Sequence, residues 1–192
     1  MKANDANHIR KMLASALMLM LLGLFTLTAL ADAGDLAATA SGEMVLEDAK
    51  TIALQSAQLQ EADVLMTLMQ KERDDGRMEF EIEFIYNGME YEFTIDAANG
   101  AIIESSRESI SKREAERVPG SYLTMNQAKE KALAEAGVAA GQATFTELEL
   151  DLDDSRVHYE IAFTDGSQNY TLEMDAITGE ILRYAAKAVR KK

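Results

Sequence analysis

The sequence predicts an α+β fold of two tandem repeats, each with one helix packed on a small antiparallel sheet of three to four strands. The first observation is internal similarity. A constant offset of 79 residues places DDGRMEFEIEF, which begins at Asp74, on DDSRVHYEIAF, which begins at Asp153, without a gap. The second observation is a helical pattern followed by period-two strand patterns in each copy. Repetition of this extent indicates a duplicated structural unit.

Each repeat is expected to open with a helix. In the second copy, Thr124 is a suitable N-cap for the run Met125–Glu135, and Gly137 stands where a helix ends. Small residues recur on one predicted face in both copies, where they would let the helix lie close to a sheet. These are Ala128, Ala132 and Ala136 in the second copy and Ala49, Ala53 and Ala57 in the first.

Strands follow the helix in each copy. Apolar and polar residues alternate over 146–152, 157–163 and 170–174, and a short last strand covers Glu180–Tyr184. Such alternation is typical of half-buried antiparallel strands. The first copy repeats it over 78–84, 91–95 and 102–103.

Composition limits the classes of function. The 192 residues carry 19 basic and 33 acidic side chains, a net charge of −14, and no cysteine. An acidic chain repels phosphate backbones, so nucleic acid is excluded as a partner. Without cysteine there is no disulfide, no thiolate metal site and no thiol nucleophile.

The N-terminus has the features of an export signal. Lys2, Arg10 and Lys11 precede an apolar run over 12–31, which ends in Ala29-Leu30-Ala31. Residues 1–31 are therefore predicted to be a signal peptide, with a membrane anchor over 12–31 as the alternative. Both interpretations place the rest of the chain outside the cytoplasm, in the periplasm or the medium. Residues 32–44 are predicted to be a flexible spacer.

Three short motifs carry a resemblance to a known family. Tyr159-Glu160-Ile161, the strand from Tyr170 to Asp175, and Thr178-Gly179-Glu180-Ile181 resemble the PepSY domain, and the first copy is similar. The resemblance implies PepSY-like domains at 45–104 and 123–186. We expect a linker at 105–122, with a charged helix within 109–117, and a basic tail at 187–192. It also implies modulation of a peptidase. Because the chain has no His-Glu-x-x-His motif, we expect it to act on another protein.

Few residues are candidates for chemistry. His158 lies on the polar side of a strand and is expected to be exposed. Asp151, Asp153 and Asp154 invite a calcium interpretation, but the sequence lacks the EF-hand glycine and glutamate, so a solvated hairpin turn is favoured. No catalytic, cofactor-binding or metal-binding residue is assigned from the sequence.

The predicted outer sheet face of the first copy is acidic. Glu79, Glu81 and Glu83 lie on one strand, and Glu90 and Glu92 lie on the next. Like charges on neighbouring strands are destabilising, so they must be offset by a basic partner, by a cation, by Arg77 and Lys71, or by solvent. On comparable positions the second copy offers only Glu160 and Glu173, which predicts that the acidic face is not duplicated.

These observations favour an exported, non-enzymatic binding module that modulates or inhibits a peptidase or another envelope protein. The alternative is a cation or small-ligand sensor that uses the acidic face, and a purely structural envelope protein is a third class. An enzyme is not expected, because no nucleophile, base and orienting group converge in the sequence.

Overall fold

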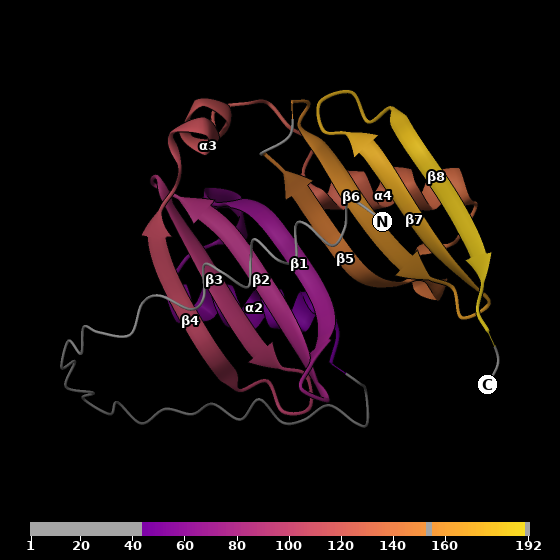
Figure 1. Cartoon of the computed structure of the whole chain (residues 1–192), viewed down its shortest axis with the longest axis horizontal. Helices are drawn as coiled ribbons and strands as arrows, with labels where there is room; N and C mark the ends of the chain where they lie inside the picture. Colours follow the sequence, from indigo (N-terminus) through magenta and orange to yellow (C-terminus); the bar gives the residue numbers. More distant parts are fainter. Residues whose placement is uncertain (1–43, 153–154, 191–192) are drawn as a thin grey trace. The chain divides into compact units, whose positions relative to one another are not determined.

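The computed structural model describes residues 44–152 and 155–190. The elements of the first repeat are α2 (Leu46–Ala57), the short 3-10 helix η1 (Glu61–Asp63), β1 (Leu65–Asp74), β2 (Arg77–Tyr86), β3 (Met89–Asp96) and β4 (Ile102–Ser109). Helix α3 (Lys112–Arg117) connects the repeats. The second repeat contains α4 (Met125–Ala136), η2 (Ala140–Gln142), β5 (Thr144–Asp151), β6 (His158–Thr164), β7 (Gln168–Asp175) and β8 (Ile181–Ala188) (Figure 1).

The strands form one antiparallel sheet in the order β4-β3-β2-β1-β5-β6-β7-β8. The repeats meet where β1 pairs with β5, through Leu68 with Glu149, Met69 with Leu148, and Gln70 with Glu147. The α+β class and the helix-then-strands order are confirmed. The expectation of two separate small sheets is wrong, because the first strand of each repeat hydrogen-bonds to the other and the two sheets become one.

Both helices cover the same face of this sheet. One row of core residues runs across the sheet beneath both helices. Ile82, which packs with α2, lies opposite Met69, and Met69 lies opposite Leu148. Leu148 lies opposite Ile161, beneath α4. Side chains directly opposite each other on neighbouring strands share a face. Figure 1 shows α2 and α4 on one side of the strands. The other face is not covered by any helix of the described residues.

The core explains the alanine pattern. Ala49 and Ala53 of α2, like Ala128 and Ala132 of α4, are fully buried against the strands. One apolar cluster includes buried residues of both repeats. A common core and a common sheet make the two repeats a single folded body over the described residues, 44–152 and 155–190.

The helix boundaries follow the predicted signals. The Thr124 Oγ1 accepts a hydrogen bond from the Gln127 amide at 3.2 Å, and Gly137 ends α4 with φ of 66°. In the connection, Ser111 caps α3 in the same way, and α3 ends before Pro119. Strand β4 continues through Ser109, which lies within the 105–122 range expected to be linker.

An ion-pair cluster joins the two helices. Glu47 of α2 lies 2.6 Å from the Nζ of Lys50 on its own helix and 2.6 Å from the Nζ of Lys129 on α4. Lys50 and Lys129 are equivalent positions of the two repeats. Burial opposes ionisation of Glu47, but the two lysines hold its pKa below the usual value.

Candidate functional site

The face opposite the helices carries a row of acidic side chains. Opposed positions on successive strands run from β3 to β7 and lie on one line across both repeats. The line contains Glu92, Glu83, Leu68, Glu149, Glu160 and Glu173. Glu81 and Glu147 lie in the adjacent row, on either side of Gln70. We call these seven glutamates the acidic face.

The acidic face extends further than the sequence predicted. Glu79, Glu81, Glu83, Glu90 and Glu92 do lie on one face of β2 and β3, as expected. The prediction that the second repeat adds only Glu160 and Glu173 is wrong, because β5 contributes Glu147 and Glu149. These two residues were visible as the polar half of an alternating strand. Their position beside the first repeat became visible only with the β1–β5 pairing.

Three groups of side chains on this face bring potential cation ligands together. In each group, one ligand atom per residue lies within 4.8 Å of the others. The groups are Glu81, Glu83 and Glu92; Glu147, Glu149 and Glu160; and Asp151, His158 and Glu160. The first two contain only carboxylates, whereas the third contains an imidazole. Glu160 belongs to two of the groups.

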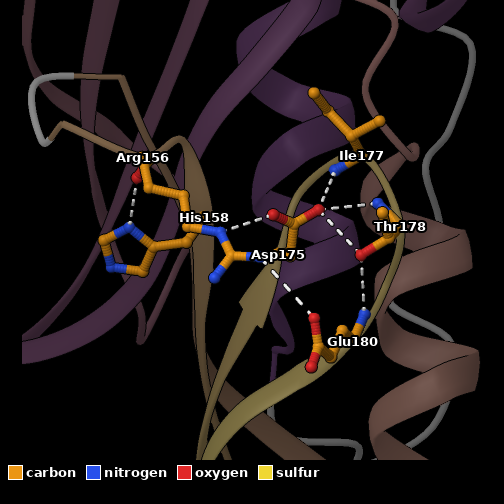
Figure 2. A network of polar contacts seen from close by, with 6 residues as sticks. All are labelled: Arg156, His158, Asp175, Ile177, Thr178 and Glu180. Carbon is orange, nitrogen blue, oxygen red and sulfur yellow. Dashed lines mark hydrogen bonds and ion pairs between the residues drawn. The ribbon is translucent and has the colours of Figure 1, made fainter.

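A second polar feature lies at the turn between β7 and β8. One oxygen of Asp175 accepts hydrogen bonds from the amides of Ile177 and Thr178 and from the Thr178 hydroxyl, at 2.7 to 3.0 Å. Its other oxygen accepts a hydrogen bond from the Nε of Arg156 at 2.7 Å. The guanidinium of Arg156 also lies 3.6 Å from Glu180 (Figure 2). Asp175 is buried, and these donors, the Thr178 amide first, hold its pKa well below the usual value.

His158 lies between this network and the acidic face. The expectation that it is an exposed strand histidine is wrong, because only 8% of the residue is accessible. Its Nδ1 lies 3.1 Å from the carbonyl oxygen of Arg156 (Figure 2). A carbonyl oxygen only accepts, so Nδ1 carries a hydrogen and donates it. Its Nε2 lies 3.6 Å from the carboxylate of Glu160.

The surroundings of His158 favour its charged form. Hydrogen bonding to Glu160 raises the pKa of His158 to about 9, more than burial lowers it, and Asp151 contributes in the same direction. In the first repeat the equivalent residue is Glu79, and burial raises the pKa of that carboxyl. Sequence reasoning missed Asp151 because it lies on β5, across from His158. Glu160 was detectable, since it follows His158 by two residues on β6 and so shares its face.

The remaining sequence-predicted features fall partly outside the described residues. Asp153 and Asp154 of the predicted solvated hairpin turn lie there, as do residues 1–43 and the last two residues of the basic tail. Within the described residues, no helix is both long and apolar enough to cross a membrane.

Each of the two helix-and-strand repeats coincides with one match to a known protein family. The profile of PepSY, described as "Peptidase propeptide and YPEB domain", matches residues 46–105 and 122–185, more than half of the chain. The chain belongs to the PepSY family. The tandem PepSY organisation suggested by the short motifs is thereby confirmed.

This PepSY protein is 43% identical over 65 residues to the uncharacterized protein Spy1430 of Streptococcus pyogenes serotype M6; the match covers 34% of this chain and 50% of that protein. The chain therefore spans about half the length of this curated relative.

Two solved structures resemble this PepSY protein. One is a crystal structure described as a lipoprotein from Clostridium difficile 630, with 22% identity and a TM-score of 0.42 over 76% of this chain and 94% of that chain. The other is the Bacillus megaterium YpeB C-terminal domain, with 17% identity and a TM-score of 0.30 over 76% of this chain and 66% of that chain.

Proposed function

We propose that this PepSY protein is an exported, non-catalytic module whose acidic face binds a basic surface of another cell-envelope protein. Membership of the family supports a binding or regulatory role. The observation that carries the proposal is the row of glutamates across both repeats, interrupted only by Leu68 of β1, on the face that neither α2 nor α4 covers.

The charge of this face supports a cationic partner. Glutamates that face each other across strands repel, as Glu83 and Glu92 do, and Glu149 and Glu160. A basic partner surface relieves that repulsion and is steered towards the face during association. From β3 to β7 the row crosses five strand spacings, about 24 Å. A partner surface of about that length contacts glutamates of both repeats at once.

The partner class implied by the family description is a peptidase. We propose that binding restrains a peptidase other than this chain, and that the PepSY units at 45–104 and 123–186 act together because their strands form one sheet. Export rests on the basic flank, apolar run and Ala-x-Ala sequence within residues 1–31. Mass spectrometry of the envelope fraction is expected to find a mature N-terminus at Asp32; a full-length membrane-bound chain would favour the anchor.

A matched pair of charge variants tests the binding surface. The first variant combines Glu83→Gln, Glu149→Gln and Glu173→Gln on the acidic face. The control combines Glu116→Gln, Glu130→Gln and Glu135→Gln on α3 and α4, where all three residues are exposed. Both variants lose three negative charges, so an effect of net charge alone acts on both equally.

The two variants and the unmodified protein are used as bait in envelope extract, and captured proteins are identified and assayed for peptidase activity. We expect the unmodified chain and the control to capture the same basic protein, and raised salt to release it. The acidic-face variant is expected to capture at least about tenfold less of that protein. Equal capture by all three baits would reject the acidic face as the binding surface. Capture of a protein without peptidase activity, or without inhibition on rebinding, would reject the peptidase part alone.

A further inference from the structure

We propose that the second repeat contains a site for a divalent transition-metal ion, with the Nε2 of His158 and carboxylate oxygens of Asp151 and Glu160 as ligands. The proposal does not depend on a protein partner, although Glu160 also belongs to the acidic face. It rests on three features: the position of these side chains on paired strands, the orientation of the imidazole, and the ligand chemistry.

The strand register brings the ligands together. Asp151 on β5 lies directly opposite His158 on β6, and Glu149 lies opposite Glu160 two residues further along the same strands. All four side chains therefore project from the same face as the corners of a small rectangle. Ligand atoms of Asp151, His158 and Glu160 already lie within 4.8 Å of one another.

The distances suit a metal ion with little movement. Two ligands of a tetrahedral zinc ion, each about 2.1 Å from the metal, are about 3.4 Å apart. The Nε2 of His158 lies 3.6 Å from the Glu160 Oε1. A metal ion would therefore enter by replacing the proton between these two atoms, with small rotations of the carboxylates.

The imidazole is held in the orientation that a metal ligand requires. Because Nδ1 donates to the carbonyl oxygen of Arg156, the ring turns Nε2 towards Glu160. Metal-binding histidines commonly donate their second ring nitrogen to a carbonyl or carboxylate, which fixes both tautomer and ring angle. His158 is also more than nine-tenths buried, so this orientation is held by packing as well.

The choice of ligands distinguishes this group from the rest of the acidic face. One imidazole with two carboxylates suits zinc and related divalent transition metals, whereas magnesium and calcium prefer oxygen ligands alone. In the first repeat, Glu72 and Glu79 occupy the positions of Asp151 and His158. That carboxylate-only counterpart has no ligand that would select a transition metal.

Zinc binding to the tag-free full chain, measured by calorimetry with magnesium and calcium as comparison ions, tests the site. We expect zinc to bind with one ion per chain and magnesium at least about tenfold more weakly. Nitrogen-detected NMR of the imidazole is expected to show a zinc-dependent shift at Nε2 of His158. The variant H158Q leaves His8 as the only histidine of the chain, so it also removes the ambiguity between the two.

H158Q is expected to weaken zinc binding at least about tenfold, whereas E83Q, which removes one carboxylate from the other repeat, is expected to leave it unchanged. If H158Q fails to fold by thermal melting, D151N and E160Q replace it, since both keep the imidazole. Equal weakening by H158Q and E83Q would show diffuse attraction to the acidic face and overturn the proposal. Zinc binding that leaves the His158 resonance unchanged, or no preference for zinc over magnesium, would overturn it as well.

Discussion

The two repeats share a scaffold but differ in how their paired arginine and aspartate are used. In the second repeat, the Nε of Arg156 lies 2.7 Å from Asp175, which also binds the turn that follows β7. In the first repeat, the equivalent Arg77 lies 3.9 Å from Asp96 and 3.6 Å from Glu79. Arg156 thus makes one short contact, with the carboxylate that organises the turn, whereas Arg77 makes only longer contacts with its two carboxylates.

The residue between arginine and aspartate accounts for this difference. In the first repeat Glu79 is a carboxylate that competes with Asp96 for Arg77. In the second repeat the position holds His158, which turns towards Glu160 and leaves Arg156 to Asp175 and Glu180. One substitution between the copies therefore changes which carboxylates the arginine pairs with, and provides an imidazole on the acidic face.

The largest expected effect concerns the shared core. Ile161→Asp places an unpaired carboxylate in an apolar interior and is expected to cost about 4 kcal/mol or more, enough to unfold the domain. Ile82→Asp should cost as much, and both repeats should unfold together because they share a sheet. The control, Ile177→Asp, makes the same change at a residue that is 62% exposed and should cost less than about 1 kcal/mol. Thermal and urea melts measure all three; independent melting of the repeats would contradict the single folded body.

The second largest effect on stability is expected at Asp175, which should contribute more than its equivalent Asp96. Asp175→Asn weakens four hydrogen bonds of a buried carboxylate and is expected to cost about 2 kcal/mol at pH 7, and Asp96→Asn about half as much. Because folding lowers the pKa of Asp175, its contribution is complete above the unfolded pKa near 3.9 and disappears as the pH falls through the folded value.

The loss of stability caused by Asp175→Asn should therefore shrink in urea melts between about pH 5 and pH 2, the range in which the unfolded carboxyl becomes protonated. A loss that stays constant over this range would show that the carboxylate charge does not stabilise the turn. Equal losses for Asp175→Asn and Asp96→Asn at pH 7 would contradict the difference between the repeats.

The arginines themselves give a smaller and well-matched test. The side chains of Arg156 and Arg77 are 54% and 58% exposed, so their solvation is nearly the same. Arg156→Gln is expected to cost about 1 kcal/mol through its short contact with Asp175, and Arg77→Gln less than about 0.5 kcal/mol. Urea melts at low and high salt separate the two. A larger loss from Arg77→Gln would mean that its longer contacts are the stronger ones.

The smallest expected effect lies at the bulge in the first strand of each repeat. The Thr146 hydroxyl donates to the carbonyl oxygen of Ala162 at 3.3 Å, whereas the buried hydroxyl of the equivalent Thr67 has no partner among the described residues. Thr146→Val should cost about 0.5 to 1 kcal/mol, and Thr67→Val should leave stability unchanged or raise it slightly. Matched losses in calorimetric melts would indicate that Thr67 is also hydrogen-bonded.

The sequence by itself determined the repeat and its local structure. Thr124 and Gly137 set the limits of α4, the buried alanines set the helix face that meets the sheet, and the period of two set which side of each strand is apolar. These features depend on contacts between residues that are near in sequence or on one element's own periodicity. The glutamates of β2 and β3 were assigned to one face for the same reason.

Only the tertiary structure decided how the repeats combine. The pairing of β1 with β5 joins residues that are far apart in sequence, such as Met69 and Leu148. The alternation of apolar and polar residues in either strand does not identify the strand with which it pairs. That pairing extends the acidic face to Glu149 and merges two sheets into one. The error about His158 has a similar cause within the second repeat, because its burial depends on the adjacent strands β5 and β7, which alternation within β6 does not reveal.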